Sequence, residues 1–308
     1  MAVTLAQLKA GTSDKIAQGV ISELQANSLL LDRLTFDDCV SANGGSNLTY
    51  GYNRVKTAST AAWRELNAEF TATEAETEKV STELGILGGS YKIDRVTANA
   101  SSGAPVDQVV MQLEEKRKAT IRSFNDAVIN GTKAANKWDG LKVALKNSST
   151  EKTATVDTKT FASIKANALE WAYEFNLWLA SLARTPDMLL VNANTKAKLG
   201  TIANVLGQYQ TQKTDAGVIY PVFAGIAVED LGPGSKDGKP VVADGDIYAV
   251  CLGMSEFHGV TLDGGNGLRV YTPNFEAEGA VHEGSVEFVC GTALKATRAA
   301  GVFHEKTA

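Results

Sequence analysis

The stretch PVDQVVMQLEEKRKATIRSFNDAVING, residues 105–131, predicts the longest helix of the chain. Its apolar residues recur at spacings of three, four and eight, as on one face of an α-helix: Val106, Val110, Leu113, Ile121, Phe124 and Val128. Ser101 and Ser102 are N-cap candidates, Pro105 suits the first turn, and Gly131 is a natural stop. About 26 residues at about 1.5 Å each give a rod of roughly 39 Å, so we expect other elements to pack along it.

The segment before this helix predicts a long β-hairpin. Residues 48–52 alternate apolar and polar side chains, and residues 79–96 do so again. Between them, residues 61–78 carry five glutamates against Arg64 alone. A two-stranded ribbon is marginal in water, so this hairpin needs a partner surface. Residues 1–34 have helical periodicity broken at Gly11 and Gly19, and we expect this segment to need a partner as well.

The segment after the helix predicts a mixed structure. Residues 147–155 form a polar joint, which is the best candidate for a domain boundary. We expect helices over 157–182 and from an Asn194 cap to Leu206, with strands over 188–191, 222–228, 241–242, 247–252 and 268–271 and an extended stretch over 285–303. Because no βαβ rhythm is sustained, the fold class is α+β.

Composition limits the classes of function. The 308 residues are 44% hydrophobic and 21% charged, which is typical of a globular protein. The net charge of −5 excludes a generally basic nucleic-acid binder. The N-terminus shows no export signal, and the longest apolar stretch, residues 247–254, is far short of the roughly 20 residues needed to cross a bilayer, so we expect a soluble intracellular protein.

Patterns with known chemistry are weak. The turn GPGSKDGK, residues 232–239, departs from a phosphate-binding loop because its glycines are too close and Pro240 follows. The glycines of 264–267 precede a strand, so they offer no helix N-terminus for a phosphate. The three histidines, at 258, 282 and 304, have no metal-ligand spacing, three separated cysteines suggest neither disulfides nor zinc, and no G-x-S-x-G elbow occurs. We therefore predict no catalytic residue, no cofactor and no metal.

Charge is the more informative pattern. The acidic hairpin and the basic side of the long helix are either two solvated faces or two surfaces that meet between subunits, where complementary charge would set register and association rate. The candidate contact residues are Trp63, Arg64, Glu69, Phe70, Glu74, Glu76, Glu78, Lys116, Arg117, Lys118 and Arg122.

An ordered series of segments resembles the major capsid proteins of tailed bacteriophages, which have the Hong Kong ninety-seven-type fold. The segments are LTYGYNRV (48–55), AAWRELNAEF (61–70), LGILGGSYKIDRV (84–96), the helix from Pro105 with WDGL (138–141), PDMLLVNANTKAKL (186–199), FAGIAVEDLG (223–232), GDIYAVCLG (245–253) and GSVEFVCGTALKATRAAGVF (284–303). The resemblance implies an N-terminal arm over 1–38, an extended loop over 39–83, a peripheral domain with a spine helix over 84–150 and 270–308, and an axial domain over 151–269.

This resemblance implies a structural subunit that forms hexamers and pentamers around double-stranded DNA, in a virion capsid assembled in the host bacterial cytoplasm. DNA would be contacted sparsely and non-specifically. The arm-like segment begins at Met1, so we expect either a separate scaffolding protein or a chain that is already mature, with a portal and a decoration protein as further partners. Some relatives crosslink a loop lysine to an asparagine; Lys56 and Lys79 lie in this loop, but no partner is marked, so no crosslink is predicted. The alternatives are an encapsulin-like nanocompartment shell and an enzyme with an unrecognised site.

Overall fold

The computed structural model describes residues 28–39, 48–57, 59–102, 107–133, 137–213, 219–234, 238–262 and 268–306. The helical segment expected over residues 1–34 lies mostly outside these ranges. Within them, only the short helix α2 (Leu29–Arg33) represents it, and the Ser28 hydroxyl caps that helix by accepting from the Leu31 N–H.

The long helix is α4 (Gln108–Asn130), and it begins slightly later than the sequence pattern suggests. Its N-cap is Asp107, whose carboxylate accepts hydrogen bonds from the N–H groups of Val109 and Val110. The prediction of a serine cap was wrong, because Ser101 instead ends a short preceding helix, α3 (Arg95–Ser101). Gly131 does end α4: an added Cβ there would lie 2.4 Å from the Ala127 carbonyl oxygen, so only glycine fits.

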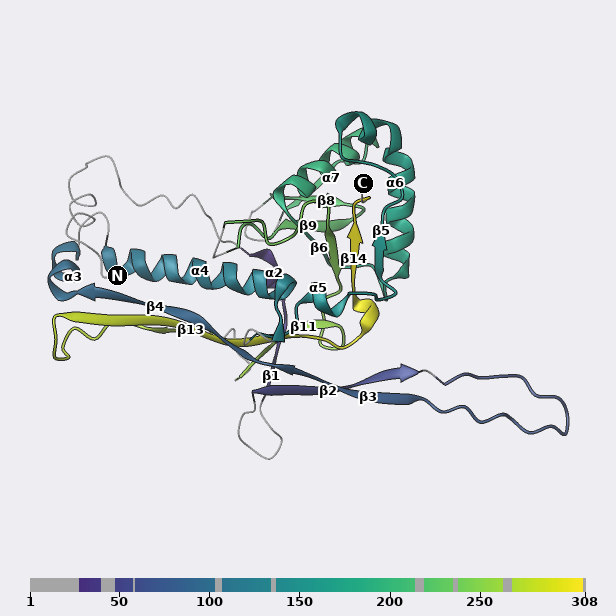
Figure 1. The fold of residues 1–308 in the computed structure, drawn as a ribbon, viewed down its shortest axis with the longest axis horizontal. Helices are drawn as coiled ribbons and strands as arrows, with labels where there is room; N and C mark the ends of the chain where they lie inside the picture. The colour runs from purple at the N-terminus through teal and green to yellow at the C-terminus, as the bar shows by residue number, and fades with distance from the viewer. Residues whose placement is uncertain are drawn as a thin grey trace.

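The helix α4 lies along a five-stranded sheet (Figure 1). The centre of this sheet is β13 (Val281–Leu294), which pairs along one edge with β4 (Gly85–Asp94). Along its other edge it pairs first with β12 (Leu268–Tyr271) and then with β11 (Phe257–Thr261), and β1 (Phe36–Asp38) adds in parallel to β11. The expected extended stretch over 285–303 is therefore two strands in different sheets, with a 3₁₀ turn between them.

The second sheet has seven strands. In spatial order they are β5 (Glu151–Thr153), β14 (Ala300–His304), β10 (Ile247–Val250), β6 (Met188–Val191), β9 (Ile226–Asp230), β8 (Ile219–Phe223) and β7 (Gln210–Lys213). The strand expected over 222–228 is split into β8 and β9 by a turn at Ala224 and Gly225, where φ is positive. Val241 and Val242 are buried but form no strand.

Two helices pack on this second sheet. The helix α6 (Phe161–Ser181) begins at a capping box in which Thr160 and Ser163 bond reciprocally, four residues after the predicted start. The helix α7 (Ala193–Val205) is capped by Asn192 rather than Asn194, because the Asn192 side chain accepts from the Thr195 N–H. Between helices and sheet lies an aromatic core in which Phe175 stacks on Trp171 and meets Phe303 edge-on.

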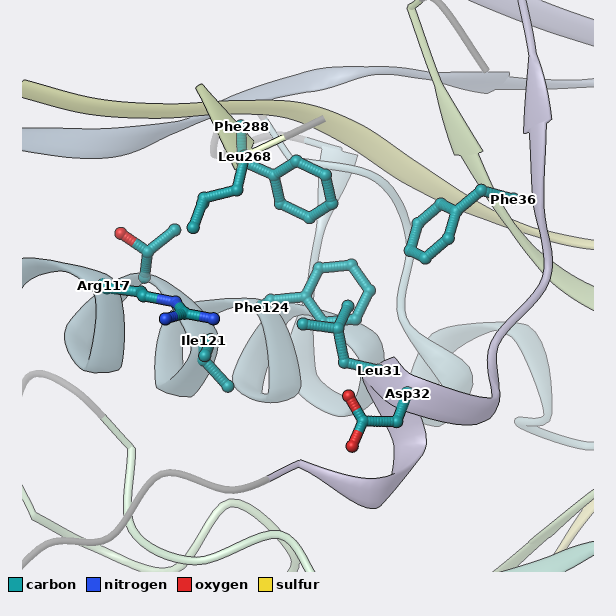
Figure 2. A pocket seen from close by; sticks show the side chains of 9 residues that line it. Leu31, Asp32, Phe36, Arg117, Ile121, Phe124, Leu268 and Phe288 are labelled. Atoms are coloured by element: carbon teal, nitrogen blue, oxygen red, sulfur yellow. The ribbon is translucent and has the colours of Figure 1, made fainter. Parts of the chain in front are cut away.

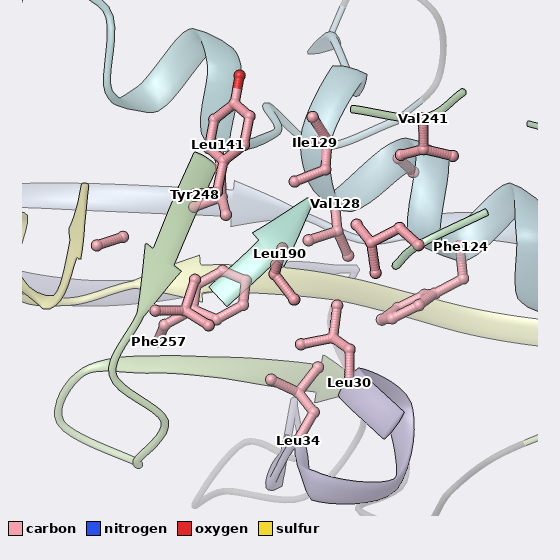
Figure 3. Close-up of a cluster of buried hydrophobic side chains, with 14 of the residues drawn as sticks. Leu30, Leu34, Phe124, Val128, Ile129, Leu141, Leu190, Val241, Tyr248 and Phe257 are labelled. Carbon is pink, nitrogen blue, oxygen red and sulfur yellow. The ribbon is translucent and has the colours of Figure 1, made fainter. Parts of the chain in front are cut away.

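A second core joins the long helix to both sheets (Figure 3). Phe124 and Val128 of α4, Leu30 of α2, Leu190 of β6 and Phe257 of β11 are all buried in it. Both sheets combine strands from before and after residue 270: β11 pairs with β13, and β10 pairs with β14. The domain ranges inferred from the resemblance remain predictions.

None of the helices within the described ranges is both long and apolar enough to cross a membrane.

Candidate inter-subunit surfaces

The predicted hairpin exists as a separate two-stranded sheet. Its strands β2 (Thr49–Thr57) and β3 (Glu76–Glu83) pair antiparallel, with Tyr52 opposite Val80. Figure 1 shows the hairpin leaving the body beneath the seven-stranded sheet, with its tip far from every other described element. The outer part of the hairpin therefore does not pack on the described core of its own chain.

The root of the hairpin is firmly attached to the body. The Tyr52 hydroxyl and the Arg54 guanidinium both donate to the Leu294 carbonyl oxygen at 2.9 Å. Tyr50 donates to Asp37, while the Lys295 ammonium lies 5.2 Å from the centre of the Tyr50 ring. Burial and the Asp37 carboxylate raise the pKa of Tyr50, so its hydroxyl stays protonated and remains a donor at neutral pH.

The tip of the hairpin exposes large apolar side chains. Trp63 is 103% exposed, Leu66 89% and Phe70 65%, all within the irregular segment between β2 and β3. We call these three residues the tip cluster. The Arg64 guanidinium lies 5.3 Å from the centre of the Phe70 ring and bonds the carbonyl oxygen of Glu65. Exposed aromatic side chains gathered at one place are typical of a protein-contact surface.

Sequence reasoning missed Leu66 as a contact candidate. Its signal was its spacing, three residues after Trp63 and four before Phe70.

The acidic candidates lie on the same element. Glu69, Glu74, Glu76 and Glu78 are all exposed on the hairpin. Glu78 is 3.8 Å from Arg54 on the facing strand, and Glu76 also has an interaction within the chain. The carboxylates of Glu69 and Glu74 carry no resolved ion pair among those found in the described residues.

The basic candidates lie on α4 and are less free than the sequence suggests. Arg117 is 4.0 Å from Glu114, and Lys118 is 3.2 Å from Glu115, both as pairs three residues apart. The Lys116 stem lies over Gly89 of β4, and Arg122 is half-buried and engaged within the chain. This face of α4 is a mixed-charge surface with a cationic excess, not a purely basic rod.

The structure does not bring the acidic and basic sets together within one chain. In Figure 1 the hairpin tip and α4 lie on opposite sides of the molecule. A contact between the two sets therefore requires a second molecule.

One pocket, of about 160 Å³, lies beside α4 (Figure 2). It is lined by Leu31, Asp32, Phe36, Arg117, Thr120, Ile121, Phe124, Leu268 and Phe288. The Thr120 hydroxyl donates to the Lys116 carbonyl oxygen, and Phe36 meets the rings of Phe124 and Phe288. Apart from Asp32 and Arg117, the wall of this pocket carries no charge.

The glycine-rich turns and the histidines considered as possible functional sites have these surroundings in the structure. In the turn at 232–239, the Gly234 N–H donates to the Lys239 carbonyl oxygen; residues 235–237 and the glycines at 264–267 lie outside the described ranges. His304 bonds Asp246 at 2.7 Å, and this contact raises its pKa, while burial lowers the pKa of His258.

The three cysteines are free and buried, and no group of three or more His, Cys, Asp or Glu within the described ranges is placed to hold a metal ion. The pKa of Cys39 and that of Cys251 are raised by burial to about 11.

Among the carboxyl groups of the described residues, that of Glu229 on β9 has the largest shift in pKa. Its side chain is buried, its oxygens make no hydrogen bond of normal length, and burial raises its pKa to about 8. The backbone N–H groups of Leu29 and Leu30 and the Lys196 ammonium oppose this shift only in part. The packing of α2 against β9 therefore depends on whether the buried Glu229 carboxyl group is charged.

Comparison with known proteins adds family and fold. The family model described as the phage capsid family matches residues 12–247. A search of curated proteins finds no match. Three solved structures illustrate the structural likeness.

The first is the holo-SrpI encapsulin complex from Synechococcus elongatus, with TM-score 0.67 and 14% identity over 99% of this chain and 96% of that one. The second is a chain of Mycobacterium phage Bobi, with TM-score 0.61 and 13% identity over 100% of both chains. The third is the capsid of a native GTA particle, with TM-score 0.62 and 12% identity over 99% of this chain and 100% of that one.

Proposed function

Because the chain belongs to the phage capsid family and has the Hong Kong ninety-seven-type fold, we propose that this capsid subunit forms the hexamers and pentamers of an icosahedral shell around double-stranded phage DNA. One observation carries the proposal. The hairpin is anchored at its root, extends away from its own core and exposes the tip cluster, which suits a surface completed by another subunit.

Assembly from such contacts needs no strong single interface. A closed lattice adds many contacts, and each subunit already held in the lattice raises the effective concentration of the next contact. Weak contacts also let misplaced subunits leave before closure. The hairpin on one side and α4 on the other offer different surfaces, as a head-to-tail contact that closes into a ring requires.

The predicted division of labour follows from this function. The arm over 1–38 and the loop over 39–83 would contact neighbouring subunits. The peripheral domain over 84–150 and 270–308 would form the wall of the shell, and the axial domain over 151–269 would form the centre of the capsomer. A separate scaffolding protein, a portal and a decoration protein would complete the particle, which would assemble in the host bacterial cytoplasm. With a net charge of −5, contact with the packaged DNA would be sparse and non-specific.

The second candidate function is an encapsulin-like nanocompartment shell. The likeness to the SrpI encapsulin, with a TM-score of 0.67, favours it specifically. Both candidates are shells of the same fold, and they differ in whether the contents are DNA or a cargo protein.

The test is expression of the full chain, alone and with the genes beside its own, followed by sedimentation and electron microscopy. Closed particles or capsomer rings support the proposal, and nuclease-protected DNA or an enclosed enzyme separates the two candidates. A chain that stays monomeric in every combination contradicts both.

A further inference from the structure

Helix α6 has a second apolar face that no other described residue of its own chain covers. The inner face, which includes Trp171, Phe175 and Trp178, is buried against the seven-stranded sheet. On the outer face, Phe161 is 68% exposed, Leu169 80%, Tyr173 65% and Leu177 48%. A helix that is apolar on both faces is normally covered on both.

The outer face has the composition of a packing surface. Leu169, Tyr173 and Leu177 fall on a four-residue repeat, which places them next to one another along the helix, whereas Lys165 separates Phe161 from them. At 100° per residue, the exposed Ala162, Ala166 and Ala180 lie in the same band. The nearest charged residues, Lys165 and Glu170, fall on the two rims of the band. We call Leu169, Tyr173 and Leu177 the α6 stripe.

A cleft lies between the end of α6 and the hairpin. Ala183, just beyond the end of α6, lines a cleft of about 550 Å³ together with Arg54 and Val55 of the hairpin. Lys295 and Arg298 also line it, and none of its nine lining residues is acidic. Figure 1 shows α6 on the side of the molecule toward which the hairpin projects. Helix α6, the cleft and the hairpin therefore lie on the same side of the subunit.

This continuity identifies what covers the stripe. A second copy held by the hairpin would lie on the same side of the subunit as α6 (Figure 1). Hydrogen bonds from Thr155 to Glu174 and from Trp178 to Thr150 hold α6 at the β5 edge of its sheet. At the opposite edge, beside β7, Val205 is 41% exposed and Tyr209 53%. One domain thus has exposed apolar side chains on both flanks, as a head-to-tail ring of identical copies requires.

We propose that the α6 stripe is an interface with a second copy of this chain, which is held at the same time by the hairpin. The proposal rests on the proposed shell function and adds a contact to it. The second copy packs apolar side chains against Leu169, Tyr173 and Leu177. The α6 stripe and the hairpin then contact the same neighbouring subunit.

The test is assembly of the full chain carrying Leu169→Lys and Tyr173→Lys. The matched control carries Leu169→Met and Tyr173→Phe, which keep the face apolar. Because both side chains are exposed, thermal unfolding of the unassembled subunit should match the wild type in each case. The lysine variant should need a subunit concentration about tenfold higher or more to assemble, and the control should assemble as the wild type does.

A second measurement keeps the test valid if the lysine variant fails to fold. Hydroxyl-radical oxidation of wild-type Leu169 and Tyr173 should be high in the free subunit and low in the assembled form. Equal oxidation in the two states overturns the α6 contact, and so does protection already present in the free subunit.

Normal assembly of a folded lysine variant would also overturn the α6 contact while leaving the shell function intact. A wild-type chain that never self-associates would overturn both.

Discussion

The Tyr50 hydroxyl donates a 2.5 Å hydrogen bond to the Asp37 carboxylate, which joins strand β2 of the hairpin to strand β1 of the five-stranded sheet. The Lys295 ammonium, 4.0 Å from the same carboxylate, places a positive charge over the Tyr50 ring. The hairpin is thus held at its root by contacts with β1 and with the end of β13, while its tip lies away from the other described elements. Its direction depends on a few contacts near residue 50.

Replacing Tyr50 by phenylalanine should loosen the hairpin without unfolding the body. The change removes one hydrogen bond to a charged acceptor, worth about 1 to 3 kcal/mol, and leaves the ring in place. Amide hydrogen exchange should rise in β2 and β3, and proteolysis between residues 59 and 75 should be faster. Exchange in α4 is the internal control and should stay unchanged. Identical exchange in β2 and β3 would show that the other root contacts hold the hairpin without Tyr50.

Trp63 should report assembly by its fluorescence. It is fully exposed, whereas Trp138, Trp171 and Trp178 are 3%, 3% and 1% exposed. In the free subunit, iodide should therefore quench one tryptophan of four, and assembly should remove that quenching. Trp63→Ser should abolish the quenchable fraction, change the free energy of unfolding by no more than about 0.5 kcal/mol, and weaken assembly. If quenching persists in closed particles, the tip cluster is not a subunit contact.

Reversing the charge of the hairpin should impair assembly and leave folding intact. Glu74→Lys, Glu76→Lys and Glu78→Lys together would repel the cationic excess of α4 in a neighbour, and the Arg54–Glu78 pair would be lost within the subunit. Light scattering should show slower assembly, with the largest effect at low salt because ions screen exposed charges. The corresponding triple glutamine variant should have an intermediate rate. Normal particles from the lysine variant would show that the acidic face is only a solvated surface.

Glu229 should make stability fall as pH rises. Its pKa is about 8 in the folded protein, above the usual 4.5, so the folded state binds a proton that the unfolded state releases. The cost is absent below about pH 4.5, grows between about pH 4.5 and 8, and is complete above that window. Glu229→Gln should therefore stabilise the protein by roughly 3 to 5 kcal/mol at pH 9 and have little effect at pH 4. Urea unfolding of both proteins at the two pH values measures this, and a pH-independent difference would contradict it.

The local elements could be predicted because their signals are local. The β6 strand at 188–191 and the β12 strand at 268–271 match the expected bounds, and α4 ends at Gly131 as expected. The cap of α4 was misassigned because Ser101, Ser102 and Asp107 all have capping side chains, and periodicity places a helix start only within a turn. The series of segments also pointed to the phage capsid family, to which the chain belongs.

The contact candidates were predicted only in part. The tip cluster and the acidic residues do share one exposed element, because all of them lie on β3 or in the segment that links β2 to β3. Two of the four basic candidates on α4, Arg117 and Lys118, are paired with Glu114 and Glu115, since residues three apart on a helix are neighbours in space. The same spacing could have indicated those pairs from the sequence.

The sequence by itself therefore determined the type of the elements, the long helix and the isolated hairpin, since periodicity and turn residues act within a few neighbouring residues. Only the tertiary structure decided that β13 and β14 lie in different sheets, that Glu229 is buried beneath α2, and that the described part of the chain leaves the second apolar face of α6 exposed. Each of these depends on which distant segments meet. The sequence does not distinguish an apolar residue that is buried by its own chain from one that is buried by another molecule.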